Sequence, residues 1–209
     1  MKRVFQWSYD NRVSREEANP SARRSQLLEA AYAYVLRHGL GEMSLRPLAA
    51  AIGSSPRVLL YLFGSKDELI RALLARARSD ELELLARAGR LQADGQAELA
   101  VLAEQTWAWL AADEHRALLK LWVEAYARSI VEPDGPWVGF ARATVDDWLD
   151  VFASAGRREG DDDSSARRRA TAVLAVLRGA LLDLLATGDV GRVTTAVQQQ
   201  IAAMVDCSR

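Results

Sequence analysis

Apolar residues recur at helical spacing along most of the chain. The first such stripe lies in residues 22–38 and ends at Gly39, a residue type that readily takes the left-handed conformation with which many helices stop. Its apolar positions are spaced three or four residues apart: Leu27, Leu28, Ala31, Tyr34 and Val35. Because residues at this spacing share one face of a helix, the pattern predicts an amphipathic helix over residues 22–38.

Two short helices are predicted next, over residues 45–52 and 56–62. Ser44 is placed to cap the first, and Ser55 followed by Pro56 is typical of the start of the second. Gly53 allows a sharp turn between them, and Gly64 ends the second. A long helix then follows from residue 66 to about residue 88, with a serine and two acidic residues at its start.

The rest of the chain also has apolar residues at helical spacing. The predicted fold class is therefore all-α, with about nine helices. Half of the 209 residues are apolar and only five are proline, a composition that favours helix over strand. Further helices are expected at about residues 96–111, 114–131, 136–155, 164–187 and 190–206.

The two short helices are spaced as in a helix-turn-helix. Leu48, Ile52, Leu59 and Leu62 can bury one common face, and Ala49 is small at the position where the helices would cross. In that arrangement the second helix enters the major groove of DNA. A helical hairpin with a purely structural role has the same spacing, so the outward-facing residues decide between the two interpretations.

Those outward residues suit contacts to DNA. An arginine can donate two hydrogen bonds to a guanine edge, and hydroxyls, cations and helix N-termini suit phosphates. The candidate DNA-binding residues are Ser44, Arg46, Ser55, Pro56, Arg57, Leu60, Tyr61 and Lys66.

Residues 24–74 resemble the DNA-binding domain of the TetR family of transcriptional regulators. The matching features are Ser44, the pair Leu48-Ala49, the turn Gly53-Ser54-Ser55, the segment Leu59 to Leu62, and the segment from Phe63 to Leu69 that contains Ser65-Lys66. The chain departs from the family pattern at Ser54, where a small apolar residue is usual. It also has Leu60, with Tyr61 one place later, where the family usually has a tyrosine, and Arg57 where a glycine is common.

The resemblance implies a domain plan. We expect a basic arm at residues 1–20, a helix-turn-helix DNA-binding domain at 21–66, and a ligand-binding and dimerising helical bundle at 67–209. The charge agrees with this plan, because residues 1–66 carry a net charge of +5 and the remainder −6. The implied partners are a double-stranded DNA operator, a small-molecule effector and a second copy of the chain.

The second half of the chain is rich in aromatic residues. Tryptophans with a few polar neighbours can line a pocket for an apolar or aromatic molecule, although each of them can equally belong to the core. The candidate ligand-binding residues are Trp107, Trp122, Tyr126, Trp137, Phe140, Thr144 and Trp148.

The last two predicted helices carry long apolar stripes. They can pair with their copies across a two-fold axis, or they can close the core of one chain. The candidate dimerisation residues are Val173, Leu177, Leu181, Val197 and Ile201.

The sequence offers no pattern for catalysis, a metal site or a cofactor. It has one cysteine, two histidines and no nucleophile paired with a base, so we expect no enzyme activity. No secretion signal or membrane-spanning run is recognised, which favours the cytoplasm and no membrane association. The expected function is that of a dimeric repressor that binds a pseudo-palindromic operator and is released by a small apolar or aromatic effector. The alternatives are a DNA-binding regulator controlled by a protein partner and a helical enzyme.

Overall fold

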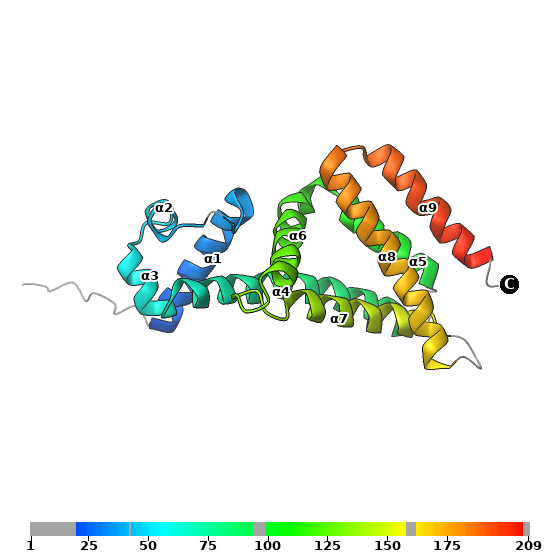
Figure 1. Ribbon diagram of the computed structural model, residues 1–209, viewed down its shortest axis with the longest axis horizontal. Coiled ribbons are helices and arrows are strands. Elements are labelled where there is room, and N and C mark those ends of the chain that lie inside the picture. Colours follow the sequence, from blue (N-terminus) through cyan, green and yellow to red (C-terminus); the bar gives the residue numbers. More distant parts are fainter. Residues whose placement is uncertain (1–19, 42, 94–98, 158–161, 207–209) are drawn as a thin grey trace, which may run out of the picture.

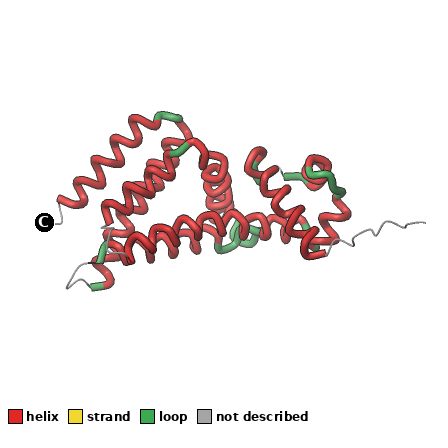
Figure 2. The backbone as a smooth tube through the Cα atoms, turned by 180° about the vertical axis from the view of Figure 1, so that it is seen from behind, coloured by secondary structure: helices red, strands yellow, loops and turns green. Residues whose placement is uncertain are grey.

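The computed structural model describes residues 20–41, 43–93, 99–157 and 162–206. Over these residues the fold is all-α, as predicted, and Figure 2 shows helices joined by short loops. The predicted arm at residues 1–20 lies outside the described residues apart from Pro20. The helices are α1 (Pro20–His38), α2 (Leu45–Ala51), α3 (Pro56–Phe63), α4 (Lys66–Ala93), α5 (Leu99–Ala111), η1 (Asp113–His115, one 3₁₀ turn), α6 (Arg116–Val131), α7 (Phe140–Ala155), α8 (Asp163–Thr187) and α9 (Val190–Asp206).

The molecule is elongated, with α1, α2 and α3 gathered at one end (Figure 1). Helix α4 runs from that end along the base of the molecule, and α6 stands across its middle. Helices α5, α7, α8 and α9 form a bundle at the other end, where α8 packs against α5, α7 and α9. This arrangement places α4 and α6 between the two ends.

Helix α7 begins four residues later than the sequence pattern suggests. Gly139 precedes it with φ 78°, a left-handed conformation that an L-residue with a side chain rarely adopts, so the chain turns there before the helix starts. Trp137 therefore lies outside α7, and its indole Nε1 donates a hydrogen bond to Glu132 Oε2 at 2.9 Å. The helix predicted over residues 136–155 therefore begins at Phe140 and does not include Trp137.

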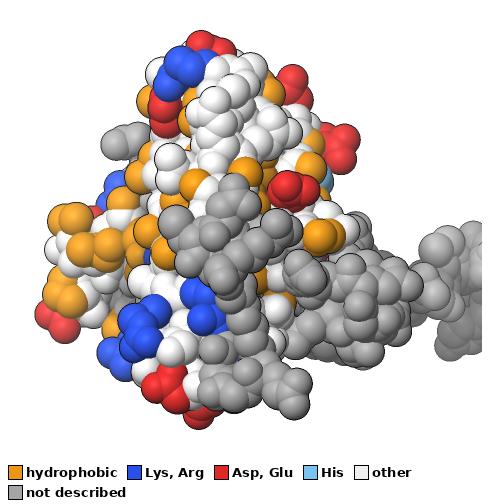
Figure 3. Space-filling view, turned by 90° about the vertical axis from the view of Figure 1, so that its right-hand side faces the viewer, with side chains coloured by type: hydrophobic (Ala, Val, Ile, Leu, Met, Phe, Trp, Pro, Cys, Tyr) orange, Lys and Arg blue, Asp and Glu red, His pale blue; other side chains and the backbone are white. Residues whose placement is uncertain are grey.

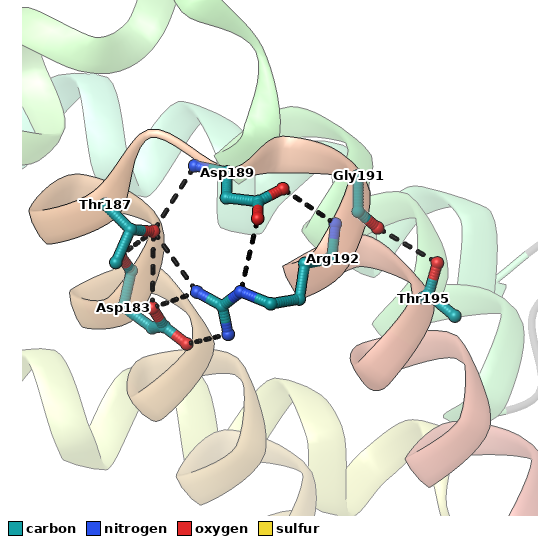
Figure 4. Close-up of polar contacts among 6 residues, drawn as sticks. All are labelled: Asp183, Thr187, Asp189, Gly191, Arg192 and Thr195. Carbon is teal, nitrogen blue, oxygen red and sulfur yellow. Dashed lines mark hydrogen bonds and ion pairs between the residues drawn. The ribbon is translucent and has the colours of Figure 1, made fainter.

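The C-terminal hairpin of α8 and α9 is fixed by Arg192. Its guanidinium reaches back from α9 to Asp183 of α8 at 2.6 and 2.8 Å and also contacts Asp189 (Figure 4). Hydrogen bonds from Arg192, strengthened by the opposite charge, hold the pKa of the Asp183 carboxyl below its ordinary value. The ion pair joins the start of α9 to α8 at the surface, while Val193, Val197 and Ile201 of α9 are buried against the bundle.

All five predicted dimerisation residues lie in the core of the single chain. Val173, Leu177, Leu181, Val197 and Ile201 are each at most 9% exposed. The hydrophobic stripe of α8 is covered by the neighbouring helices of its own bundle, so the second of the two sequence interpretations describes these residues. The outward face of α8 consists instead of small or apolar residues one turn apart, namely Ala172, Ala175, Gly179, Leu182 and Ala186.

Helix α8 is also the one helix among the described residues with the length and hydropathy of a membrane span. Its most apolar stretch of eighteen residues has a mean hydropathy of 1.7. A mostly buried core helix passes the same test; 33% of this stretch of α8 is buried, and α8 packs against α5, α6, α7 and α9. On the face turned to the viewer in Figure 3, acidic, basic and hydrophobic side chains are interspersed among the described residues that are visible.

Candidate nucleic-acid interface and ligand cavity

Helices α2 and α3 form the predicted helix-turn-helix. Gly53 turns the chain with φ 64°, and Leu48, Ala49, Leu59 and Phe63 are buried between the helices and their neighbours. Phe63 thus takes the fully buried position that the sequence pattern assigned to Leu62, which is half-buried. These contacts hold α3 at a set angle on the end of the molecule.

The ends of α3 are made by the residues that the sequence predicts. The Ser55 hydroxyl accepts a hydrogen bond from the Val58 backbone N–H at 3.2 Å, with Pro56 in the first turn, and Gly64 ends the helix with φ 86°. The predicted cap at Ser44 is wrong, because the Ser44 side chain makes no capping hydrogen bond to α2. Ser44 is exposed, so its hydroxyl remains available to another molecule.

The outward face of α3 carries the residues expected to read DNA. Tyr61 is 82% exposed and Leu60 41%, and Arg57 is also exposed. Arg46 at the start of α2 and Lys66 at the start of α4 are exposed too, whereas Ser55 and Pro56 are half-buried. Arg46, Arg57 and Lys66 form no ion pair with another described residue, so each is available to a phosphate or a base.

Three polar contacts join α1 and the residues just after it to α4 and α6. The Tyr32 hydroxyl donates to Asp80 Oδ2 of α4 at 2.7 Å, and Arg76 pairs with both Asp80 and Glu29. Burial, followed by the hydrogen bond to Asp80, raises the pKa of Tyr32 above its ordinary value. On the other side of α1, the Leu40 backbone N–H donates to Glu124 Oε2 of α6 at 2.9 Å.

The bundle contains a cavity of about 260 Å³. Its wall comes from five helices, α4, α5, α6, α7 and α8, and is almost entirely apolar. Exposed Ile130 and Leu182 are part of the lining, so the cavity reaches the surface between α6 and α8. A concave apolar site with a few polar groups is the usual form of a small-molecule pocket.

Four of the seven predicted ligand residues line this cavity, namely Trp122, Tyr126, Thr144 and Trp148. The other three do not. Trp107 is buried on the far side of α5 and donates to Thr194 Oγ1 of α9 at 3.0 Å, Trp137 packs under Arg128, and Phe140 is half-buried outside the lining. Packing decides which aromatic rings face the hollow, and helical spacing alone does not reveal it.

Two charged lining residues were missed from the sequence, Glu81 and Arg178. Each has a sequence signal, since Glu81 continues the buried line of Ala77 and Leu85 along α4, and Arg178 interrupts the leucines of α8. An ionisable residue in an apolar stripe is uncommon and points to a specific partner.

Glu81 is fully buried and has its partners within the protein. Arg78 pairs with it, the Trp148 Nε1–H donates to Oε1 at 2.8 Å, and Thr144 lies at 3.4 Å from Oε2. Arg78 also pairs with Asp147 and donates to the Ala143 carbonyl at 3.0 Å. The network joins α4 to α7, and it neutralises the carboxylate at the cavity wall.

The fold and this geometry define a helical protein with an exposed helix-turn-helix at one end and an apolar cavity in the bundle at the other. The sequence profile described as "Bacterial regulatory proteins, tetR family" matches residues 27–73, which span most of α1 through the start of α4. By this match residues 27–73 carry the N-terminal domain of the TetR family of transcriptional regulators.

The similarity to known proteins extends over most of the chain. The chain is 26% identical over 172 residues to the HTH-type nicotine-responsive transcriptional repressor HdnoR of Paenarthrobacter nicotinovorans, covering 78% of this chain and 84% of HdnoR. The structure resembles a TetR transcription regulator from Haloarcula marismortui with a TM-score of 0.71 at 16% identity, covering 90% of this chain and 98% of the other. It also resembles the multidrug binding protein EbrR complexed with proflavin, with a TM-score of 0.62 at 23% identity, covering 85% and 99%.

Proposed function

We propose that this protein is a cytoplasmic, ligand-responsive repressor. Residues 21–66 bind DNA, and residues 67–209 bind a small apolar or aromatic effector and form a homodimer. The two reading helices of the dimer bind the halves of a pseudo-palindromic operator, and the effector releases them. HdnoR is a nicotine-responsive repressor and EbrR has been crystallised with proflavin, and both precedents support this reading.

The observation that carries the proposal is the position of α6. Trp122 and Tyr126 on one side of the helix line the cavity, while Glu124 on another side accepts the hydrogen bond from Leu40 at the end of α1. A molecule that fills the cavity must contact α6. Any shift of α6 moves Glu124, which holds the end of α1 through the hydrogen bond from Leu40. Binding energy at the cavity can thus alter the separation of the two reading helices, provided that the effector prefers the shifted arrangement.

The DNA contacts follow from the exposed residues of the helix-turn-helix. Arg57 is placed to reach a base edge, Leu60 can pack on a thymine methyl group, and Tyr61 can donate to a phosphate. Ser44, Arg46 and Lys66 at the helix starts are suited to phosphates on either side, with Ser55 and Pro56 setting the start of α3.

The dimer is proposed to form through the outward faces of α8 and α9. Small residues on α8 let a partner helix approach closely, and the five residues named from the sequence support this face from within. One reading helix discriminates too little between sequences, so two related by symmetry are needed for a specific operator.

Two alternatives are less well supported. A regulator controlled only by a protein partner has no need of an internal hollow, whereas the bundle holds a cavity of about 260 Å³. For an enzyme, the cavity wall would have to supply reacting groups. Its one carboxylate, Glu81, is held in a structural network, and no group of metal-ligating side chains occurs among the described residues.

The test is DNA binding by the purified protein, measured by footprinting on the DNA around its own gene and by genome-wide selection, at a stated salt concentration. A protected pseudo-palindrome is expected, and Arg57→Ala is expected to weaken specific binding by about 1 to 3 kcal/mol, the usual contribution of a good base contact. Arg71→Ala is the matched control, because Arg71 is exposed nearby but already paired with Glu68. If neither method finds a bound sequence, the helix-turn-helix has only a structural role.

A further inference from the structure

We infer that the effector of this cavity is an anion, an apolar or aromatic body carrying a carboxylate or similar acidic group that pairs with Arg178. This inference rests on the proposed function, since it names the chemical class of the ligand for the same site. It follows from a comparison of the two charged residues in the cavity wall.

Arg178 has no acidic partner among the described residues. Its Nη1 lies 3.3 Å from the Tyr126 hydroxyl, and its guanidinium carbon lies 5.0 Å from the centre of the Tyr126 ring. Its Nη2 is buried and makes no hydrogen bond with any described residue. The nearest acidic residue along α8, Asp183, is engaged by Arg192.

Arg178 is half-buried in the wall of this apolar cavity, with the Tyr126 hydroxyl and ring as its partners and no carboxylate among the described residues beside it. Removing a cation from water without a counter-charge is unfavourable, and a ligand that brings a negative charge relieves that cost. The fork of guanidinium donors also matches a carboxylate geometrically.

A second unused donor lies in the same wall. The Trp122 indole Nε1 is buried and has no hydrogen-bond partner among the described residues. Trp122 and Tyr126 are one turn apart on α6, and Arg178 lies over the Tyr126 ring, so the three residues are neighbours in the lining. Two donors without acceptors favour a ligand that supplies acceptor oxygens.

Glu81 does not offset this charge. Its carboxylate is paired with Arg78 and accepts the Trp148 hydrogen bond, so it gives a cationic ligand no free acceptor without breaking the α4–α7 network. Arg78 is shared between Glu81 and Asp147, so Glu81 is held in the α4–α7 network and does not pair with Arg178. The selectivity for anions is therefore a property of this chain's own residues.

The experiment compares three probes with the same naphthyl body: naphthylacetate, naphthylethanol and naphthylethylammonium. Binding to the full-length protein is measured by isothermal titration calorimetry and by equilibrium dialysis. Naphthylacetate is expected to bind at least about tenfold more tightly than the other two, because a charge-assisted hydrogen bond forms with the anion alone.

Substitutions of Arg178 then test whether this residue causes the preference for the anionic probe. Arg178→Met should lower the affinity for naphthylacetate to that for naphthylethanol, while affinity for the alcohol changes by less than about twofold. Arg178→Lys should keep part of the preference, because it keeps the charge. Arg168→Met is the matched control, since Arg168 is exposed on α8 outside the lining, and should leave all three affinities unchanged.

The outcomes separate this inference from the proposed function. If wild-type protein binds the ammonium or the alcohol as tightly as naphthylacetate, the inference is overturned, and this ranking decides even if Arg178→Met fails to fold. If none of the three probes binds to protein that still binds its operator, sensing of small molecules at this cavity fails, and the inference fails with it.

Discussion

The buried carboxylate of Glu81 provides a direct test of how α4 is attached to α7. In Glu81→Ala the Trp148 Nε1–H loses its acceptor, and an unsatisfied buried donor costs about 1 to 3 kcal/mol. Removing one partner of a buried ion pair typically costs about 3 to 5 kcal/mol, but Arg78 keeps Asp147 and the Ala143 carbonyl. We therefore expect the free energy of unfolding to fall by about 2 to 3 kcal/mol.

The assay is urea unfolding followed by far-UV circular dichroism, with all variants at one protein concentration because a dimer's apparent stability depends on it. Glu83→Ala is the matched control, since Glu83 is exposed two residues away on α4, and a change within about 0.5 kcal/mol is expected there. Glu81→Gln retains an acceptor for Trp148 and should lie between the two. If Glu81→Ala is as stable as Glu83→Ala, the carboxylate is not structural, and the argument that it is unavailable to a cationic ligand fails with it.

Three further predictions concern the contacts of α1 with α6 and α4 and the proposed dimer interface on α8. Glu124→Gln should reduce the effector-induced loss of operator affinity by about fivefold, measured by gel shift with and without effector, because a partly exposed charge-assisted hydrogen bond to Leu40 contributes about 1 kcal/mol; an unchanged response would show that α6 is not the link. The raised pKa of Tyr32 means that its protonated form is favoured by folding, so its contribution is present below pH 10 and is lost as pH rises through the folded-state pKa. Unfolding of wild type and Tyr32→Phe across alkaline pH should show the wild-type advantage shrinking above pH 10, and a constant difference would refute the assignment. Gly179→Arg should give a folded monomer in sedimentation experiments, since nothing lies within 4 Å of a β-carbon at that position, and a persistent dimer would place the interface elsewhere.

The helix-turn-helix was predictable because its signals are local. Gly53 and Gly64 adopt positive φ, Ser55 caps α3, and the exposed positions of Arg57 and Tyr61 follow from which residues of α3 are buried. Each of these depends on neighbours within a few residues, which the sequence displays directly.

The cavity was predictable only in outline. The aromatic richness indicated a pocket, yet Trp107 and Trp148 both lie in predicted helices and only Trp148 lines the cavity. Their positions depend on how five helices pack together, and a left-handed glycine before α7 moved Trp137 out of the helix altogether. Arg178 is a clear departure from the apolar pattern of α8, but its significance depends on having no acidic partner nearby, which only the structure shows.

The two faces of α6 also bear on how such a protein can change over evolutionary time. Under the proposed function, substitutions on the outward side of α3 alter operator choice without touching the cavity, and substitutions at Arg178 alter effector choice without touching the helix-turn-helix. Glu124 and Trp122 lie two residues apart on one rigid helix, so changes there affect recognition and response together. The operator sequence and the effector can thus change independently among descendants, while α6, which lies between the two sites, is inherited as a unit.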